Sequence, residues 1–282
     1  MTAVAAIDLG GTDMKGAVVR ARGELEHAET RPTGREDGPE AVLGRLAGFA
    51  ADLAAAGPVR AVGVAVPGLV DEAGGHAVAA VNLGWRDVPL RTRLQDELGL
   101  PVAVAHDVRA AALAEGELGA ARGCCDWLLV TLGTGVGAAV VLGSAPYGGA
   151  HGAAGELGHL VVRPGGPECA CGARGCVEAL ASAGAIERRA GRPVREAIAT
   201  DDPAWREAID ALAAGLAAYA VVMDPERIVV GGGLAAAGDA LFGPLAQALA
   251  ERLTFTPAPP LVPAALGADA GCHGAALAAR AL

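Results

Sequence analysis

The sequence predicts an α/β fold built from two similar halves. Apolar β-branched runs alternate with Ala/Leu-rich segments along the chain, as in the strand-like run Val59–Val66 and the helix-like segment Leu90–Leu98. Two short Gly/Thr turns, Gly10-Gly11-Thr12 and Gly133-Thr134-Gly135, each connect a pair of apolar runs and lie about 120 residues apart. Repetition of the same strand–turn–strand theme indicates an internally duplicated fold.

The periodicity of apolar residues places the expected elements in order. Strands are expected at 3–9, 16–20, 59–66, 102–105, 127–131, 136–142 and 227–230, and helices at 40–56, 90–98, 109–118, 182–192, 203–223 and 274–282. Residues 144–177 are rich in loop-forming residues. We expect a small lobe over 1–108, joined by the C-terminal segment 272–282, and a large lobe over 109–271.

Composition limits the class of protein. The 282 residues suffice for two packed domains, and 52% are apolar although only 3% are aromatic. The core must therefore be built from Ala, Val and Leu, and the 42 glycines allow close packing of helices on sheets. A net charge of −10 without a basic run argues against a nucleic-acid partner.

The start of the chain predicts a strand. Met1 is followed directly by Val4-Ala5-Ala6-Ile7-Asp8, with no charged region before an apolar stretch, so a signal peptide is not expected. No run of about 18 apolar residues predicts a membrane span. We therefore expect a cytoplasmic protein without a membrane partner.

The first glycine turn has the composition of a phosphate-binding turn. Glycines let backbone amides approach a phosphate closely, and a threonine adds a hydroxyl donor. Asp8, at the strand end, is placed to hold Mg²⁺ through water. The candidate nucleotide-binding residues are Asp8, Gly10, Gly11, Thr12 and Lys15. Taken alone, the same residues also fit an ordinary hairpin turn.

Two further glycine turns strengthen this interpretation. The second turn offers Thr131, Gly133, Thr134 and Gly135, and the third offers Gly232 and Gly233 after the strand-like run 228–230. The second turn is neither a Walker loop nor a dinucleotide fingerprint, because no Gly-Lys-Ser/Thr opens a helix there and a strand follows it. Three glycine turns at strand ends predict a binding site for a nucleoside triphosphate.

A cluster of thiols predicts a metal site. Three of the six cysteines, Cys169, Cys171 and Cys176, fall within eight residues, and His159 precedes them. One imidazole and three thiolates form a closed tetrahedral zinc site, which is structural because protein fills all four positions. The alternative is a set of free thiols in a loop.

Two glutamates flank this cluster. Glu156 lies three residues before His159, and Glu178 two residues after Cys176. Folding around zinc would bring both carboxylates together, where they suit sugar hydroxyls, and the second imidazole nitrogen of His159 could also face substrate. The alternative is that both glutamates are solvated surface charges.

Asp107 follows a strand-like run and precedes a helix. This position suits a general base that accepts a hydroxyl proton during phosphoryl transfer, and it equally suits an N-cap of the helix.

Together these residues resemble the ROK family of sugar kinases and repressors. The resemblance rests on the motifs 8–12, 67–70, 82–85, 107–115, 131–137, 155–159 and 169–178. It implies an actin-like (ribonuclease H-like) fold of two lobes with an interdomain cleft. It also implies Asp107 as the base, structural zinc on the four residues above, ATP with Mg²⁺, and a homodimer or homotetramer. The residues implied near the sugar are Pro67, Gly68, Asn82, His106, Asp107, Glu156, His159 and Glu178.

The residues on either side of Asp107 depart from the family pattern. The family has Asn-Asp followed by Ala-Asn, whereas this chain has His106-Asp107 followed by Val108-Arg109. The family asparagine touches ring hydroxyls, and His106 is bulkier and could carry a charge. A modified sugar, such as the amino sugar kanosamine or a C7-cyclitol, is therefore an alternative to glucose.

The leading hypothesis is an ATP-dependent kinase that phosphorylates a hydroxyl, at the primary 6-position, of glucose or a glucose-like sugar. A repressor would require an additional DNA-binding segment, for which the turn starting near Ala3 leaves no room. A sugar-sensing regulator without such a segment remains the non-enzyme alternative. Polyphosphate-using relatives generally lack the zinc cysteines, so the three thiols favour ATP as the phosphoryl donor.

Overall fold

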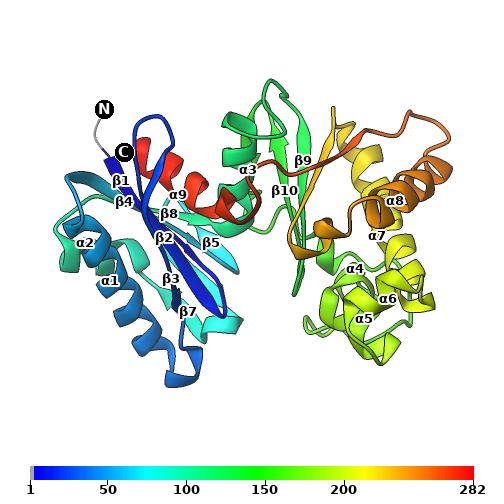
Figure 1. Ribbon diagram of the computed structural model, residues 1–282, viewed down its shortest axis with the longest axis horizontal. Helices are drawn as coiled ribbons and strands as arrows, with labels where there is room; N and C mark the ends of the chain where they lie inside the picture. Colours follow the sequence, from blue (N-terminus) through cyan, green and yellow to red (C-terminus); the bar gives the residue numbers. More distant parts are fainter. Residues whose placement is uncertain (1–2) are drawn as a thin grey trace. The chain divides into compact units, whose positions relative to one another are not determined.

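A computed structural model describes residues 3–282, which form two compact units (Figure 1). The first unit contains residues 3–114 together with 148–153 and 268–282, and the second contains 115–147 and 154–267. Met1 and the residue after it, at the start of the expected lobe 1–108, lie outside the described residues. Each unit is built around one five-stranded sheet.

The sheet of the first unit has the order β3-β2-β1-β4-β8. Its strands are β1 (Ala3–Leu9), β2 (Asp13–Val19), β3 (Leu25–Pro32), β4 (Val59–Val66) and β8 (Val102–His106). Strands β3, β2 and β1 pair antiparallel, whereas β1, β4 and β8 run parallel. The carboxyl ends of three neighbouring strands therefore meet at one edge of this sheet.

Both faces of this sheet are covered by helices. Along β1, Ala5 and Ile7 pack with α1 (Pro39–Ala55) and α2 (Leu90–Leu98), whereas Ala6 packs with α9 (Ala270–Arg280). The two-residue period of the strand puts alternate side chains on opposite faces, and both faces are apolar, as in buried parallel sheets.

Glycine allows α9 to pack closely. A Cβ added to Gly274 would lie 1.9 Å from the carbonyl oxygen of Ala110 in α3 (Asp107–Glu117). Only a residue without a side chain fits between these two helices. This is the close packing expected from a glycine-rich sequence with few aromatic residues.

A small antiparallel sheet of order β5-β6-β7 completes the first unit. Its strands are β5 (Leu69–Asp71), β6 (His76–Ala80) and β7 (Trp85–Val88), with the 3₁₀ helix η2 (Val81–Leu83) between β6 and β7. A further 3₁₀ helix, η1 (Arg35–Asp37), precedes α1.

The sheet of the second unit repeats the first, with the order β11-β10-β9-β12-β13. Its strands are β9 (Trp127–Leu132), β10 (Val136–Leu142), β11 (Ala145–Tyr147), β12 (Ile228–Gly231) and β13 (Leu261–Pro263). The hairpin strands again pair antiparallel, and β9, β12 and β13 run parallel. The predicted α/β duplication is confirmed.

The second unit also contains helices and short 3₁₀ turns. They are η3 (Leu157–His159), α4 (Val177–Ala181), α5 (Ala183–Ala190), α6 (Val194–Ala199), α7 (Pro203–Met223), η4 (Gly233–Ala237) and α8 (Asp239–Arg252). The last turn, η5 (Gly267–Asp269), lies where the chain returns to the first unit. Trp205 and Leu212 of α7 belong to the same apolar core as Val130 of β9.

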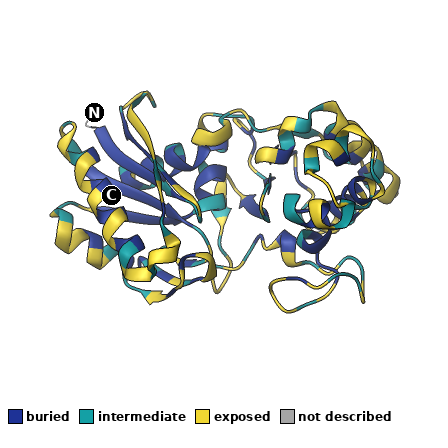
Figure 2. Cartoon of the chain, turned by 60° about the horizontal axis from the view of Figure 1, so that its bottom comes forward, coloured by how far each residue is buried: buried dark blue, intermediate teal, exposed yellow. Residues whose placement is uncertain are grey.

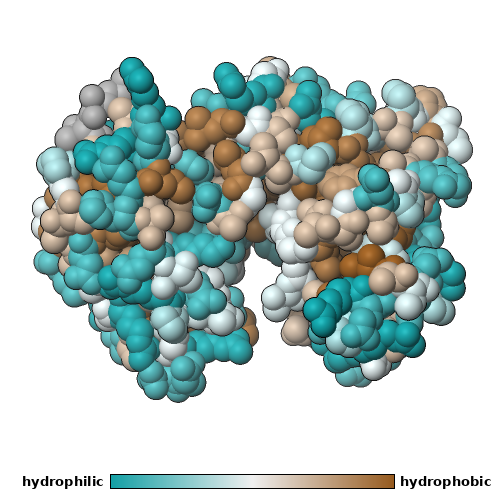
Figure 3. Space-filling model, in the orientation of Figure 1, coloured by the Kyte–Doolittle hydropathy of each residue, from teal (hydrophilic) through white to brown (hydrophobic). Residues whose placement is uncertain are grey.

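Strands are the most buried elements of both units. Figure 2 shows strands that are mostly buried and helices with exposed outer faces, and hydrophilic residues predominate over α1 on the face drawn in Figure 3. Among residues 3–282, no helix combines the length and the apolar character needed to cross a bilayer.

Several elements were absent from the sequence prediction. Strand β3 carries the charged residues Glu26, Glu29 and Arg31 and is mostly exposed, and β5, β6 and β7 are only three to five residues long. Such strands have little apolar periodicity, so they form because they pair with a neighbouring strand. The helix expected over 182–192 is shorter, because it ends at Gly191, whose φ is 66°.

Candidate functional site

The carboxyl-terminal edge of the first sheet collects predicted site residues from three neighbouring strands. Asp8 lies near the end of β1, Pro67 and Gly68 follow β4, and His106 ends β8. The register pairs Asp8 with Ala65, and Val66 with His106, so these strand ends are level. In parallel sheets this edge is where ligands commonly bind.

The first glycine turn is held by a residue that the sequence did not single out. Thr33, which is fully buried, donates its hydroxyl hydrogen bond to the carbonyl oxygen of Gly10 at 2.7 Å, and its N–H donates to the carbonyl of Thr12 at 2.8 Å. The side chain of Asn82 lies beside the turn, 3.1 Å from where a Cβ on Gly11 would be. The turn is thus held open, with Asn82 next to it.

Asp8 is an acid in an unfavourable environment. Burial raises the pKa of its carboxyl to about 6, and Lys15, its partner across the hairpin, partly opposes this shift. A Cβ on Gly271, in the first turn of α9, would lie 2.3 Å from Asp8 Oδ2. The carboxylate therefore faces the amino-terminal end of a helix, and a bound cation there would offset part of its desolvation.

Asp107 opens helix α3 at the same edge. Its Oδ1 accepts a hydrogen bond from the N–H of Val108 at 2.7 Å, and Nε2 of His106 lies 3.3 Å from that same oxygen. Burial, with a contribution from Arg109, lowers the pKa of His106 to about 3, so the ring is neutral near pH 7. The charge that the sequence allowed for His106 is therefore absent near neutral pH.

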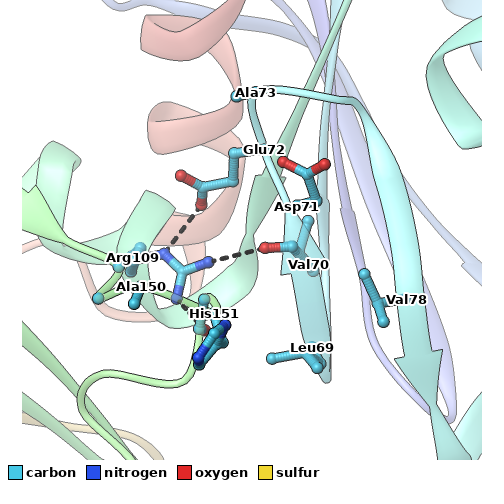
Figure 4. Close-up of a pocket in the computed structure, with 12 residues that line it drawn as sticks. Leu69, Val70, Asp71, Glu72, Ala73, Val78, Arg109, Ala150 and His151 are labelled. Carbon is cyan, nitrogen blue, oxygen red and sulfur yellow. Dashed lines mark hydrogen bonds and ion pairs between the residues drawn. The ribbon is translucent and has the colours of Figure 1, made fainter.

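A cavity of about 490 Å³ adjoins this edge within the first unit (Figure 4). Its wall includes Asp71, the last residue of β5, and Glu72 after it, together with Arg109 of α3 and His151 in the 148–152 segment. Arg109 is only 3% exposed, and its Nε donates to Glu72 Oε1 at 3.0 Å. The sequence offered no signal for Glu72, whose role depends on a partner 37 residues away.

The second unit brings together the other two glycine turns. Thr131 pairs with Gly231, and a Cβ on Gly232, where φ is 84°, would lie 2.3 Å from the carbonyl oxygen of Leu132. The glycine turn 133–135 and the cluster 231–233 are thus neighbours at the end of one sheet. This arrangement suits phosphate and a flat ring lying against backbone.

The four predicted metal ligands form one cluster. The ligand atoms of His159, Cys169, Cys171 and Cys176 all lie within 4.8 Å of one another. Cys169 Sγ lies 3.7 Å from His159 Nδ1, and Cys171 Sγ lies 3.7 Å from Cys176 Sγ. A tetrahedral zinc with Zn–S bonds of about 2.3 Å has edges of about 3.8 Å, so these residues fit zinc.

The backbone of the metal loop is shaped by a glycine. Gly175 has a φ of 78°, and a Cβ there would lie 1.6 Å from the carbonyl oxygen of Arg163. Its own carbonyl accepts from the N–H groups of Val162 and Arg163. A left-handed glycine is therefore required immediately before Cys176.

The two predicted acidic groups have different surroundings. Glu156 Oε2 lies 3.8 Å from Nε2 of His159, the nitrogen that does not face Cys169. Glu178 Oε2 instead accepts a hydrogen bond from the backbone N–H of Val136 at 2.9 Å. Glu178 is thus anchored to the strand that follows the glycine turn 133–135.

The predicted residues therefore fall into two local groups. The first unit assembles Asp8, Gly10, Gly11, Thr12, Lys15, Pro67, Gly68, Asn82, His106 and Asp107, and the second assembles Thr131, Gly133, Thr134, Gly135, Glu156, His159, Cys169, Cys171, Cys176, Glu178, Gly232 and Gly233.

Comparison with known proteins gives one consistent result. Residues 4–281 match the model of the ROK family. The chain is 34% identical to a glucokinase of Thermotoga maritima, over 96% of this chain and 95% of that protein. It is 35% identical to a kanosamine kinase of Amycolatopsis mediterranei, over 95% and 93% of the two chains.

A solved structure agrees over the whole length. The ROK family glucokinase of Streptomyces griseus, in complex with glucose and AMPPNP, superposes with a TM-score of 0.88 at 31% identity, covering 99% of this chain and 100% of that one. The duplicated fold, the matched motifs and these relatives lead to one assignment. The chain belongs to the ROK family.

Proposed function

We propose that Asp107 is the general base of this chain, an ATP-dependent sugar kinase. In this role its carboxylate accepts the proton of a sugar hydroxyl as the oxygen attacks the terminal phosphate of ATP. We assign the primary 6-hydroxyl of glucose or a glucose-like sugar as the acceptor. The observation that carries the proposal is the carboxylate at the end of β8, held through Oδ1 by the N–H of Val108 and facing His106.

The remaining groups are proposed to align the reactants. The three glycine turns would bind the phosphates and adenine through backbone N–H groups, and Mg²⁺ bound with ATP neutralises phosphate charge. Zinc on the Cys₃His cluster would be structural, because all four positions are protein ligands. It would hold Glu156, the free nitrogen of His159 and Glu178 in place for sugar hydroxyls.

A modified sugar is the second candidate substrate. His106 replaces the asparagine of the family pattern, and one relative, at 35% identity, is a kanosamine kinase. Because His106 is neutral, it would neither attract nor repel a charged sugar amine strongly. The neighbouring carboxylate of Asp107 would favour such an amine, whereas the charge of Glu72 is offset by its ion pair with Arg109.

The test is release of ADP from ATP with a panel of glucose, mannose, amino sugars and cyclitols. Asp107→Asn should lower kcat by 100-fold or more, about the size of a general-base contribution, with the sugar Kd nearly unchanged. Asp96→Asn, an exposed aspartate on α2, is the matched control. An active Asp107→Asn enzyme would disprove the assignment of the base.

The same panel separates an enzyme from a sensor. A sugar that raises the melting temperature without ADP release would support a sugar-sensing regulator instead. The family resemblance also supports a homodimer or homotetramer, which light scattering of the purified protein would test.

A further inference from the structure

Arg109 is a buried cation that joins three segments of the first unit. Its Nε donates to Glu72 Oε1 at 3.0 Å, its Nη1 to the carbonyl oxygen of Gly152 at 2.9 Å, and its Nη2 to that of Val70 at 3.5 Å (Figure 4). A buried guanidinium is tolerated only with such partners. Arg109 thereby links α3, the 148–152 segment and the turn after β5.

Glu72 connects this cation to His106. The same oxygen, Oε1, accepts the backbone N–H of His106 at 2.8 Å. One carboxylate oxygen therefore holds the end of β8 and the Arg109 side chain together. A displacement of Glu72 or Arg109 would therefore displace His106 as well.

The backbone of Arg109 determines which nitrogen of His106 carries the proton. The N–H of Arg109 donates to His106 Nδ1 at 3.4 Å, so Nδ1 must present its lone pair. A neutral ring then carries its proton on Nε2, which lies 3.3 Å from Asp107 Oδ1. The side chain of His106 is 9% exposed and is directed at Asp107.

We propose that Arg109 and Glu72 are positioning residues, which hold His106 with its Nε2–H directed at the carboxylate of Asp107 and so orient the base. The proposal rests on the proposed role of Asp107. It links the departures at positions 106 and 109 from the family pattern, because one oxygen of Glu72 accepts both from the side chain of Arg109 and from the backbone N–H of His106. His106 then acts mainly through Asp107 rather than by contacting the sugar.

A double-mutant cycle on kcat tests this coupling. Arg109→Met and His106→Leu should each lower kcat about tenfold, with the KM for ATP unchanged, and the double variant should be no slower than the slower single variant. Losses that multiply would show that the two residues act independently and would overturn the proposal. A rise in sugar KM alone in Arg109→Met would overturn it as well.

Conservative variants separate positioning from general damage to the fold. His106→Asn restores an N–H donor, so it should keep more kcat than His106→Leu, and adding Arg109→Met to it should cost little further. Glu72→Gln keeps an acceptor oxygen and should stay near the native kcat, whereas Glu72→Leu should match Arg109→Met. If Arg109→Met fails to fold, the Glu72 pair gives the same test.

The outcomes distinguish this proposal from the proposed function. If Asp107→Asn is active, Asp107 is not the base, and the proposed function fails whatever the double-mutant cycle shows. If Asp107→Asn is inactive but the losses in the cycle multiply, only the positioning role of Arg109 and Glu72 is disproved. Equal kcat in His106→Leu and the native enzyme would also contradict that role.

Discussion

Glu178 accepts a hydrogen bond from the backbone N–H of Val136 at 2.9 Å. Because Glu178 lies two residues after the metal-cluster residue Cys176, this bond ties the metal loop to the strand that leaves the glycine turn 133–135. The carbonyl oxygen of Gly133 also accepts the N–H of Ala183, at the start of α5. The metal loop and the candidate nucleotide turn are therefore one local assembly.

Replacement of Glu178 should separate its two proposed roles. Glu178→Ala removes the acceptor for the Val136 N–H, so we expect the KM for ATP to rise by severalfold, about the effect of one lost hydrogen bond of 1 kcal/mol. Glu178→Gln keeps an acceptor oxygen and should retain the KM for ATP. Steady-state kinetics against both substrates checks this, and equal KM values for ATP in the two variants would contradict the anchoring role.

Loss of the metal should weaken sugar affinity. Cys171→Ser or prolonged chelation removes one ligand or the ion, and the loop that carries His159 and Glu178 then loses its constraint. We expect a tenfold or larger rise in sugar Kd by calorimetry, together with loss of stoichiometric zinc by elemental analysis. Cys125→Ser, an exposed thiol outside the cluster, should change neither quantity. Native sugar affinity in metal-free protein would show that the metal does not order the sugar site.

The ionised carboxylate of Asp8 should lower the free energy of unfolding of the unliganded protein. A shift of its pKa from 3.8 to about 6 makes the ionised form unfavourable near neutral pH. Asp8→Asn should therefore raise the free energy of unfolding at pH 7.5 by about 1–2 kcal/mol, after allowing for partial exposure, while lowering activity.

The pH dependence of this difference has a definite sign. The folded state binds a proton more tightly than the unfolded state, so native protein gains stability relative to Asp8→Asn as pH falls from about 6 towards 3.8. Denaturant titrations at pH 7.5 and pH 4 should show the difference shrinking. A difference that is the same at both pH values would mean that burial of Asp8 carries no cost.

Gly274 and Gly44 offer a matched pair of helical glycines. A Cβ at position 274 meets the carbonyl oxygen of Ala110, whereas nothing lies within 4 Å of one at Gly44. We expect Gly274→Ala to destabilise the protein by about 2 kcal/mol or more, through overpacking. Gly44→Ala should stabilise it by about 0.5–1 kcal/mol, through helix propensity. Thermal unfolding of both variants tests this: a Gly274→Ala variant as stable as Gly44→Ala would show that close contact does not require glycine in α9.

The sequence alone determined the class, the duplication and the family. Apolar runs such as Ala61–Val66 predict buried parallel strands, and glycine turns at strand ends are visible without a structure, because both signals are local. The spacing of Cys169, Cys171 and Cys176 likewise predicted a metal cluster, because ligands close in sequence need little tertiary help to meet.

Tertiary structure decided the features that depend on distant partners. The support of the first glycine turn by Thr33, the anchoring of Val136 by Glu178, and the sharing of Glu72 between Arg109 and His106 join residues 23, 42 and 34–37 positions apart. A polar side chain has the same local pattern in a turn, on the surface or in a buried network. Only folding, which forces each buried donor and acceptor to find a partner, reveals which of these it occupies.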